Sequence, residues 1–214
     1  YNPNKIIQKP NKEYWESILN NELSPLTYRS IQGLYAPGST FKMVVAIAGI
    51  THGIIDTNTK HFCSGKIGLG DRLYHCWKNN GHGSMNVSDA IKESCDVFFY
   101  EISKKIGIDK ISKVAEDFGL GKIYDIPLPN QKKGIIPSRD WKKKKYDESW
   151  YPGETLISAI GQGFVLTNPL QLAVMTSIIA SNGKNIKPNI IKQNNDIEFE
   201  KLEKYQNAIQ IIKN

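Results

Sequence analysis

The 214-residue chain lacks several features that mark common functional classes. No run of apolar residues reaches the roughly 18 to 20 that a membrane-spanning helix needs, and the first residues, YNPNKIIQKPNKEYW, lack the apolar core of a signal peptide. Arginine occurs only as Arg29, Arg72 and Arg139, so the net charge of +7 rests mostly on scattered lysines. Nucleic-acid surfaces more often interleave arginine with aromatic residues along one face, and we therefore predict no nucleic-acid partner.

The length and the 40% apolar content allow one hydrophobic core, and no internal repeat divides the chain. Helical patterns dominate. The cap residues and apolar periods predict helices over parts of 11–31, over 39–51, after Asn86, from 96 to a stop at Gly107, over 109–118, and from Pro169 to about Asn182. Asn168 should cap the last of these, with Gln171 closing a capping box. Residues 56–86 should form a loop-rich insert, 126–150 a surface excursion, and the segment after Pro188 should end on a helix.

The stretch YAPGSTFKMVVAIAGI places a lysine near the start of an apolar helix. Burial of an unpaired ammonium is costly, so a lysine there calls for a use. Ser39 and Lys42 are three positions apart and share a helix face, where an amine can activate a hydroxyl as a nucleophile. Ser-x-x-Lys is a short pattern, however, and a lysine-rich chain produces it by chance. Its meaning depends on the rest of the sequence.

All three cysteines lie in one short window with a histidine, in the order C-x12-C-x5-H-x12-C. We predict that Cys63, Cys76, His82 and Cys95 bind a structural Zn²⁺, because this glycine-rich segment has too few apolar residues to hold its own shape. The C-x2-C pairs typical of zinc ribbons are missing, and two alternatives stay open. One is a disulfide plus a free thiol, and the other is three buried cysteines acting as small apolar residues.

Two further histidines compete as ligands. His75 adjoins Cys76, where neighbouring side chains usually diverge, and His61 could replace Cys63 if the loop folds differently. His52 follows the apolar helix with no cysteine near it, and we assign it a structural role.

Three ordered motifs carry a family resemblance. In chain order they are GLYAPGSTFK, then Ser94-Cys95-Asp96 followed by VFFYEIS, and then IGQGFVLTNPLQLA. Together they resemble the transpeptidase domain of class B penicillin-binding proteins of the elongation type. The resemblance implies an α+β, penicillin-binding protein/serine β-lactamase-like fold, represented mainly by its helical part, with sheet strands missing at both ends. It implies that residues 1–214 are a partial transpeptidase domain, with the zinc-binding segment at 60–96.

The resemblance also implies roles for four candidate catalytic residues. Ser39 would attack the carbonyl of a D-Ala-D-Ala stem peptide, and neutral Lys42 would be its general base. Ser94 would relay a proton toward the leaving group. Asp96 stands where the broader family has asparagine, and its carboxylate would oppose the neutral form of Lys42 unless a proton is shared or Asp96 points elsewhere.

The family's third motif, Lys-Thr-Gly or Lys-Ser-Gly, does not occur in the sequence. We expect it beyond the segment that follows Pro188, in a longer protein of which this chain is a truncated part. Loss of the oxyanion donor on its strand would cost about 10²–10³ in rate, so the chain alone is expected to be acylated slowly or not at all.

The resemblance further implies partners and a location. These are peptidoglycan stem peptides, β-lactam antibiotics and membrane proteins of the elongation machinery, at the periplasmic face of the bacterial inner membrane, with an anchor outside this chain. Alternatives are a serine β-lactamase, a β-lactam-binding sensor, or a non-catalytic zinc-stabilised remnant. Because Cys95 lies between Ser94 and Asp96, bound zinc would order the turn that carries both.

Overall fold

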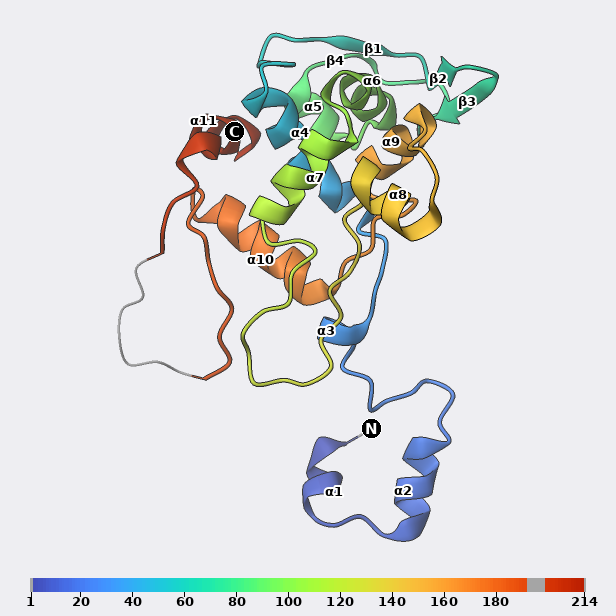
Figure 1. Cartoon of the computed structure of the whole chain (residues 1–214), viewed down its shortest axis with the longest axis vertical. Coiled ribbons are helices and arrows are strands. Elements are labelled where there is room, and N and C mark those ends of the chain that lie inside the picture. Colours follow the sequence, from blue (N-terminus) through green and yellow to red (C-terminus); the bar gives the residue numbers. More distant parts are fainter. Residues whose placement is uncertain (1, 192–198, 214) are drawn as a thin grey trace.

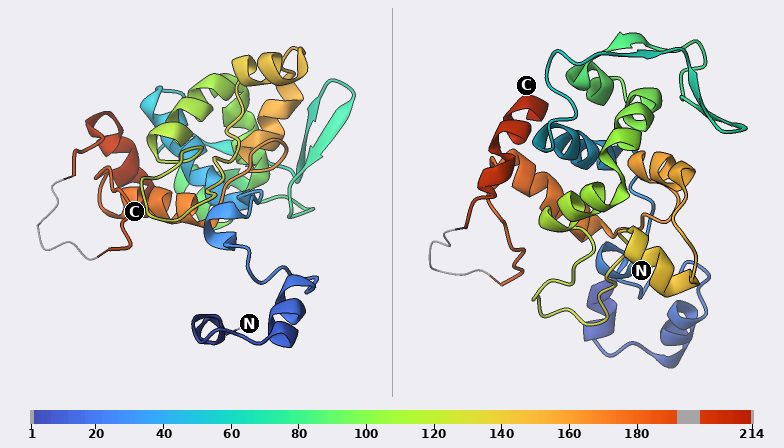
Figure 2. Two further views of the ribbon diagram at one scale, coloured as in Figure 1. Left: turned by 60° about the horizontal axis from the view of Figure 1, so that its bottom comes forward. Right: turned by 45° about the horizontal axis from the view of Figure 1, so that its top comes forward.

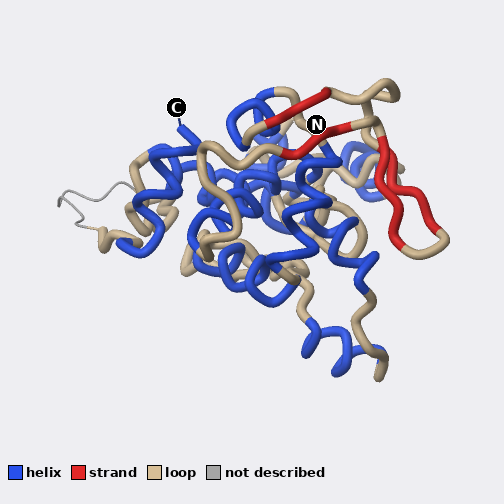
Figure 3. The backbone as a smooth tube through the Cα atoms, turned by 90° about the horizontal axis from the view of Figure 1, so that it is seen from above, coloured by secondary structure: helices blue, strands red, loops and turns tan. Residues whose placement is uncertain are grey.

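The computed structural model describes residues 2–191 and 199–213, and helices are its main regular elements (Figures 1 and 3). The elements follow one another as α1 (Pro3–Ile7), α2 (Lys12–Leu19), α3 (Arg29–Gln32), η1 (Gly38–Phe41), α4 (Lys42–Thr51), β1 (His61–Cys63), β2 (Lys66–Leu69), β3 (Arg72–His75), β4 (Gly83–Met85), α5 (Val87–Lys92), α6 (Asp96–Ile106), α7 (Ile108–Asp117), α8 (Arg139–Tyr146), α9 (Pro152–Ala159), α10 (Pro169–Ala180), η2 (Glu203–Tyr205) and α11 (Gln206–Lys213).

Helix α4 lies at the centre of the helical body. Between Lys42 and Thr51 it is apolar on all sides, as expected of a buried helix, and every residue from Val44 to Ala48 is completely buried. Helices α6, α7 and α11 pack against it. The predicted buried helix over 39–51 is confirmed, except that its first turn is the tighter 3₁₀ turn η1.

Local capping signals fix several helix ends as predicted. Asn86 accepts a hydrogen bond from the backbone of Asp89 at the start of α5, and Gly107 ends α6 with a φ of 81°. Asn168 caps α10, but the second half of the predicted capping box is wrong. The Gln171 side chain instead donates to the carbonyl oxygens of Lys122 and Lys133, because these backbone acceptors lie beside it in the folded chain.

The predicted loop-rich insert contains four short strands, which corrects that part of the sequence interpretation. Strand β1 pairs antiparallel with β4, and β2 pairs antiparallel with β3. Each strand has three or four residues, too few for an alternating pattern to be read. The Gly70-Asp71 turn of the β2–β3 hairpin is a local signal that was available. The predicted surface excursion likewise contains α8, capped by Ser138.

The short strands run along one edge of the helical body, and the β2–β3 hairpin projects from it (Figures 1 and 2). Helices α1 and α2 form an arm that extends away from the body at the opposite end. The expected helix after Pro188 is η2 with α11, while residues 192–198 of that segment lie outside the described residues. In residues 2–191 and 199–213, no helix combines the length and apolar character needed to cross a membrane.

Candidate active site and metal centre

A glycine contact positions Ser39 at the mouth of the central helix. The backbone N–H of Gly38 donates to the carbonyl of Gly161 at 2.9 Å, and a Cβ on Gly161 would lie 2.2 Å from the Gly38 oxygen. Only glycine at 161 allows this approach. Tyr35 and Thr167, which flank the Gly38–Gly161 contact in the sequence, exchange two backbone hydrogen bonds at 2.8 and 2.9 Å. The IGQGFVLTNP segment therefore supports the turn that leaves Ser39 exposed.

The four candidate catalytic residues form one hydrogen-bonded chain. Ser39 Oγ lies 2.7 Å from Ser94 Oγ, Lys42 Nζ donates to Ser94 Oγ at 2.9 Å, and the same Nζ lies 2.6 Å from Asp96 Oδ1. The i, i+3 spacing places Ser39 and Lys42 on one face of the 3₁₀ turn. Ser94 Oγ bridges them by contacting both.

Lys42 has three acceptors within reach of its nitrogen. Besides Ser94 Oγ and Asp96 Oδ1, Nζ donates to the Ser94 carbonyl at 2.8 Å. The Lys42 side chain is only 2% exposed, and three acceptors match the three N–H bonds of an ammonium. Asp96 thus points toward Lys42. This contact removes one of the two possibilities left by the sequence, namely that Asp96 points elsewhere.

A left-handed backbone at Ser94 produces this arrangement. Its φ is 53°, a region that serine seldom adopts, and it lies between the end of α5 and the start of α6. Asp96, the first residue of α6, reaches Lys42 because α6 packs on α4.

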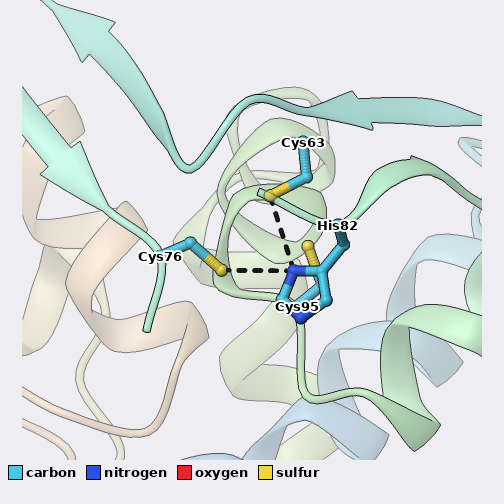
Figure 4. A group of neighbouring side chains, drawn as sticks. All are labelled: Cys63, Cys76, His82 and Cys95. Carbon is cyan, nitrogen blue, oxygen red and sulfur yellow. Dashed lines mark hydrogen bonds between the residues drawn. The ribbon is translucent and has the colours of Figure 1, made fainter. Parts of the chain in front are cut away.

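The four predicted metal ligands also converge (Figure 4). Their ligand atoms all lie within 4.8 Å of one another, and the three cysteines are free, buried thiols. The sulfur atoms of Cys63 and Cys76 each lie 3.6 Å from His82 Nδ1. A single imidazole nitrogen cannot satisfy two thiol donors, so a pair of ordinary hydrogen bonds does not explain the geometry.

These distances fit a tetrahedral zinc site. Zn–S bonds of about 2.3 Å and a Zn–N bond of about 2.0–2.1 Å place sulfur and nitrogen about 3.6 Å apart. Burial raises the pKa of Cys95 to about 12, so this sulfur is a thiolate at neutral pH only beside a cation. Burial also lowers the pKa of His82, which favours the neutral imidazole that binds metals.

The competing histidines lie outside this group of ligand atoms. His61 packs edge-on against the Phe98 ring, and His75 is exposed to solvent. Cys95 immediately precedes Asp96 and is the N-cap residue of α6, so the predicted metal ligands and the candidate catalytic residues share one turn.

Trp77 also belongs to the site, and the sequence interpretation missed it. Its backbone N–H donates to Asp96 Oδ2 at 3.0 Å, and its indole Nε1–H donates to the carbonyls of Glu93 and Ser94, both at 3.1 Å. The available signal was an isolated tryptophan beside Cys76 in a segment otherwise rich in glycine and asparagine.

Comparisons with known proteins match this chain along most or all of its length. The family model described as penicillin binding protein transpeptidase domain matches residues 1–214. The peptidoglycan D,D-transpeptidase MrdA of Acinetobacter baumannii is 36% identical over 194 residues, which are 90% of this chain and 29% of that protein. This chain thus spans under a third of that relative.

Solved structures show the same fold. The penicillin-binding protein PBP2 of Helicobacter pylori is 33% identical with a TM-score of 0.92, covering 99% of this chain and 40% of that one. A complex between PBP2 and MreC of Helicobacter pylori matches with a TM-score of 0.87 at 33% identity, covering 95% of this chain and 38% of that chain. The expected penicillin-binding protein fold, represented mainly by its helical part, is confirmed.

Proposed function

We propose a function from one premise: the chain belongs to the penicillin-binding protein transpeptidase family. It carries the acylating part of a peptidoglycan D,D-transpeptidase, with Ser39 as nucleophile. The observation that carries this proposal is the continuous chain of contacts from Ser39 Oγ through Ser94 Oγ and Lys42 Nζ to Asp96 Oδ1. Through this chain of contacts, the proton of Ser39 Oγ can pass by way of Ser94 to Lys42, which is the buried base.

In the proposed reaction, Lys42 first transfers one proton to Asp96 and becomes a neutral amine. Ser39 Oγ then bonds to the carbonyl carbon of D-Ala-D-Ala, its proton moves to Ser94, and the Ser94 proton moves to Lys42. Collapse of the tetrahedral intermediate breaks the C–N bond, and the leaving D-alanine amine takes a proton back through Ser94. The amine nitrogen of a neighbouring stem peptide next bonds to the ester carbon and gives a proton through Ser94 to Lys42. The bond between that carbon and Ser39 Oγ then breaks, and Oγ takes the proton back through Ser94, which completes the cross-link and restores the hydroxyl. Asp96 finally returns its proton to Lys42. A β-lactam would stop at the ester.

The test is acylation by a labelled penicillin in the full-length gene product. Mass spectrometry should place the adduct on the Ser39 peptide, and Ser39→Ala should abolish it. Ser17→Ala, a change of the same kind at an exposed residue of α2, should label normally. Labelling of Ser39→Ala at another residue would contradict the proposal.

Release of the label separates the alternatives. A serine β-lactamase would release hydrolysed penicillin with turnover, whereas a transpeptidase or a sensor stays acylated. Release of D-alanine from a stem peptide, coupled to an amine acceptor, separates a transpeptidase from a sensor. A non-catalytic remnant would show no acylation.

We also propose that Cys63, Cys76, His82 and Cys95 hold a structural Zn²⁺. The support is the convergence of three thiols and one imidazole nitrogen at tetrahedral spacing in a segment of short strands. The metal supplies a fixed anchor for the backbone of Cys95, and thereby for Ser94 and Asp96 on either side. It takes no part in the proton transfers.

The proposed setting is the periplasmic face of the bacterial inner membrane, where peptidoglycan is cross-linked. Stem peptides and β-lactams are the proposed small partners. The solved complex of a similar protein with MreC supports membrane proteins of the elongation machinery as partners of the full-length protein.

A further inference from the structure

The placement of Trp77 is not explained by burial. Its side chain is 62% exposed, although tryptophan is among the residues that gain most from burial. Its one polar atom, Nε1, is nevertheless fully used, because it donates to two carbonyl oxygens at 3.1 Å each. The ring also meets the edge of His82, with centroids 5.3 Å apart. The indole is thus held by its polar end, with much of its apolar surface in solvent.

The two carbonyls that accept this N–H belong to the turn that aims Ser94. Glu93 is the C-cap of α5, and Ser94 follows it with the left-handed φ of 53°. The Ser94 carbonyl accepts from Trp77 Nε1 and from Lys42 Nζ, so two donors fix one peptide group from two elements. A left-handed serine persists only where its surroundings hold it.

The backbone of Trp77 acts on the other partner of Lys42. Its N–H binds Asp96 Oδ2 at 3.0 Å, which leaves Oδ1 free to face Lys42 Nζ. One residue of the segment between β3 and β4 therefore contacts both Ser94 and Asp96, which both contact Lys42.

We infer that Trp77 is a positioning residue of the acylation site. Its indole N–H holds the left-handed turn so that Ser94 Oγ faces Ser39 and Lys42 together. Trp77 contacts neither Ser39 nor Lys42 in the described hydrogen-bond network, and it acts through Ser94. This inference rests on the proposed function.

The test is Trp77→Phe in the full-length gene product, measured as acylation kinetics with a labelled penicillin. The change keeps an aromatic ring and the backbone N–H but removes the indole donor. We expect acylation roughly 3- to 10-fold slower, the effect of losing one net hydrogen bond, with the dissociation constant of the non-covalent penicillin complex within about twofold of the original. Ser94 should move while Asp96 stays in place.

Trp150→Phe is the matched control, because Trp150 Nε1 donates to Thr155 Oγ1 of α9 at 2.8 Å, and neither residue takes part in the hydrogen bonds that join Ser39, Lys42, Ser94 and Asp96. It should acylate at the original rate. An unchanged rate in Trp77→Phe, or equal slowing in both variants, would overturn the inference. If Trp77→Phe fails to fold, replacement of Trp77 by 3-benzothienylalanine, which has sulfur in place of the indole N–H, tests the same donor. Failure of the proposed function is distinguishable, since the unsubstituted protein would then not be labelled on Ser39.

Discussion

Lys42 and Asp96 form a buried ion pair whose two atoms are 2.6 Å apart, at the end of the chain of contacts that starts at Ser39. Transfer of one proton within this pair would produce the neutral amine that base catalysis needs, without exchange with solvent. The aspartate at this position therefore has a definite chemical consequence. In the proposed mechanism it receives the proton that Lys42 must lose before Ser39 can be activated.

Asp96→Asn should slow acylation. In the proposed mechanism the Asp96 carboxylate accepts a proton from Lys42, and an asparagine amide cannot accept it, so the acylation rate constant should fall by about tenfold or more. Stopped-flow acylation with a chromogenic β-lactam measures this rate constant.

Asp117→Asn provides the control, because Asp117 also pairs with lysine but at a remote site. Its acylation rate constant should match that of the unsubstituted protein. An unchanged rate constant for Asp96→Asn would show that Asp96 does not receive the proton.

At the scale of elements, the segment from β1 to the start of α6 has little apolar interior of its own, and its four strands are short. Three of the four proposed zinc ligands lie on or beside strands, and Cys95 caps α6. A metal bond at this point would fix irregular backbone that packing alone would hold weakly.

Loss of a metal ligand should therefore remove both zinc and stability. Protein purified without chelator should contain about one zinc per chain. Cys76→Ser or His82→Ala should lower the zinc content and reduce Tm by roughly 10 °C, the effect of losing several kcal/mol. Elemental analysis and thermal unfolding measure the two quantities. His75→Ala, at the adjacent exposed histidine, should change neither, and a metal-free protein with a Cys63–Cys76 disulfide and normal stability would rule out the site.

Helix α7 is joined to η2 by a second polar cluster. The Asp117 carboxylate accepts hydrogen bonds from Lys113, Lys204 and Tyr205 at 2.7–2.8 Å. Burial opposes its ionisation, but these hydrogen bonds outweigh burial and lower the pKa of Asp117 to about 2. Because the folded-state pKa is below the unfolded-state value, the ionised carboxylate stabilises the fold above about pH 4, and this contribution disappears as the pH falls toward 2.

Asp117→Asn should lower the free energy of unfolding at pH 7 by roughly 1–2 kcal/mol, a value discounted for partial exposure of the carboxylate. The difference from the unsubstituted protein should shrink as the pH falls from about 4 toward 2. Denaturant titrations at several pH values measure it, with the exposed neighbour Glu116→Gln as control. A difference that stays constant down to pH 3 or below would contradict the assigned cause.

At the scale of the whole molecule, the chain matches under a third of MrdA, and no helix of the described residues could cross a membrane. The proposed setting therefore makes a prediction about the full-length gene product. It should fractionate with membranes, and protease added to the periplasmic side should reach this domain. Recovery in the cytosolic fraction would contradict the proposed location.

The sequence by itself determined several helix ends, and it singled out the proposed nucleophile and the proposed metal ligands. Caps such as Asn86, Gly107 and Asn168 act on neighbouring backbone groups, so the helix ends that they set can be predicted from the local sequence. The pair Ser39 and Lys42 is set by spacing within one turn. The four proposed metal ligands stand out because all three cysteines fall in one short window.

Only the tertiary structure decided how these groups meet. Ser94 and Asp96 lie more than fifty positions from Lys42 along the chain, and their contacts exist because α6 packs on α4. The direction of the Asp96 carboxylate and the left-handed turn at Ser94 depend on Trp77, whose partners no local pattern specifies. The four short strands of the insert could not be predicted from the sequence either, because their stability comes from distant backbone partners and not from their own residues.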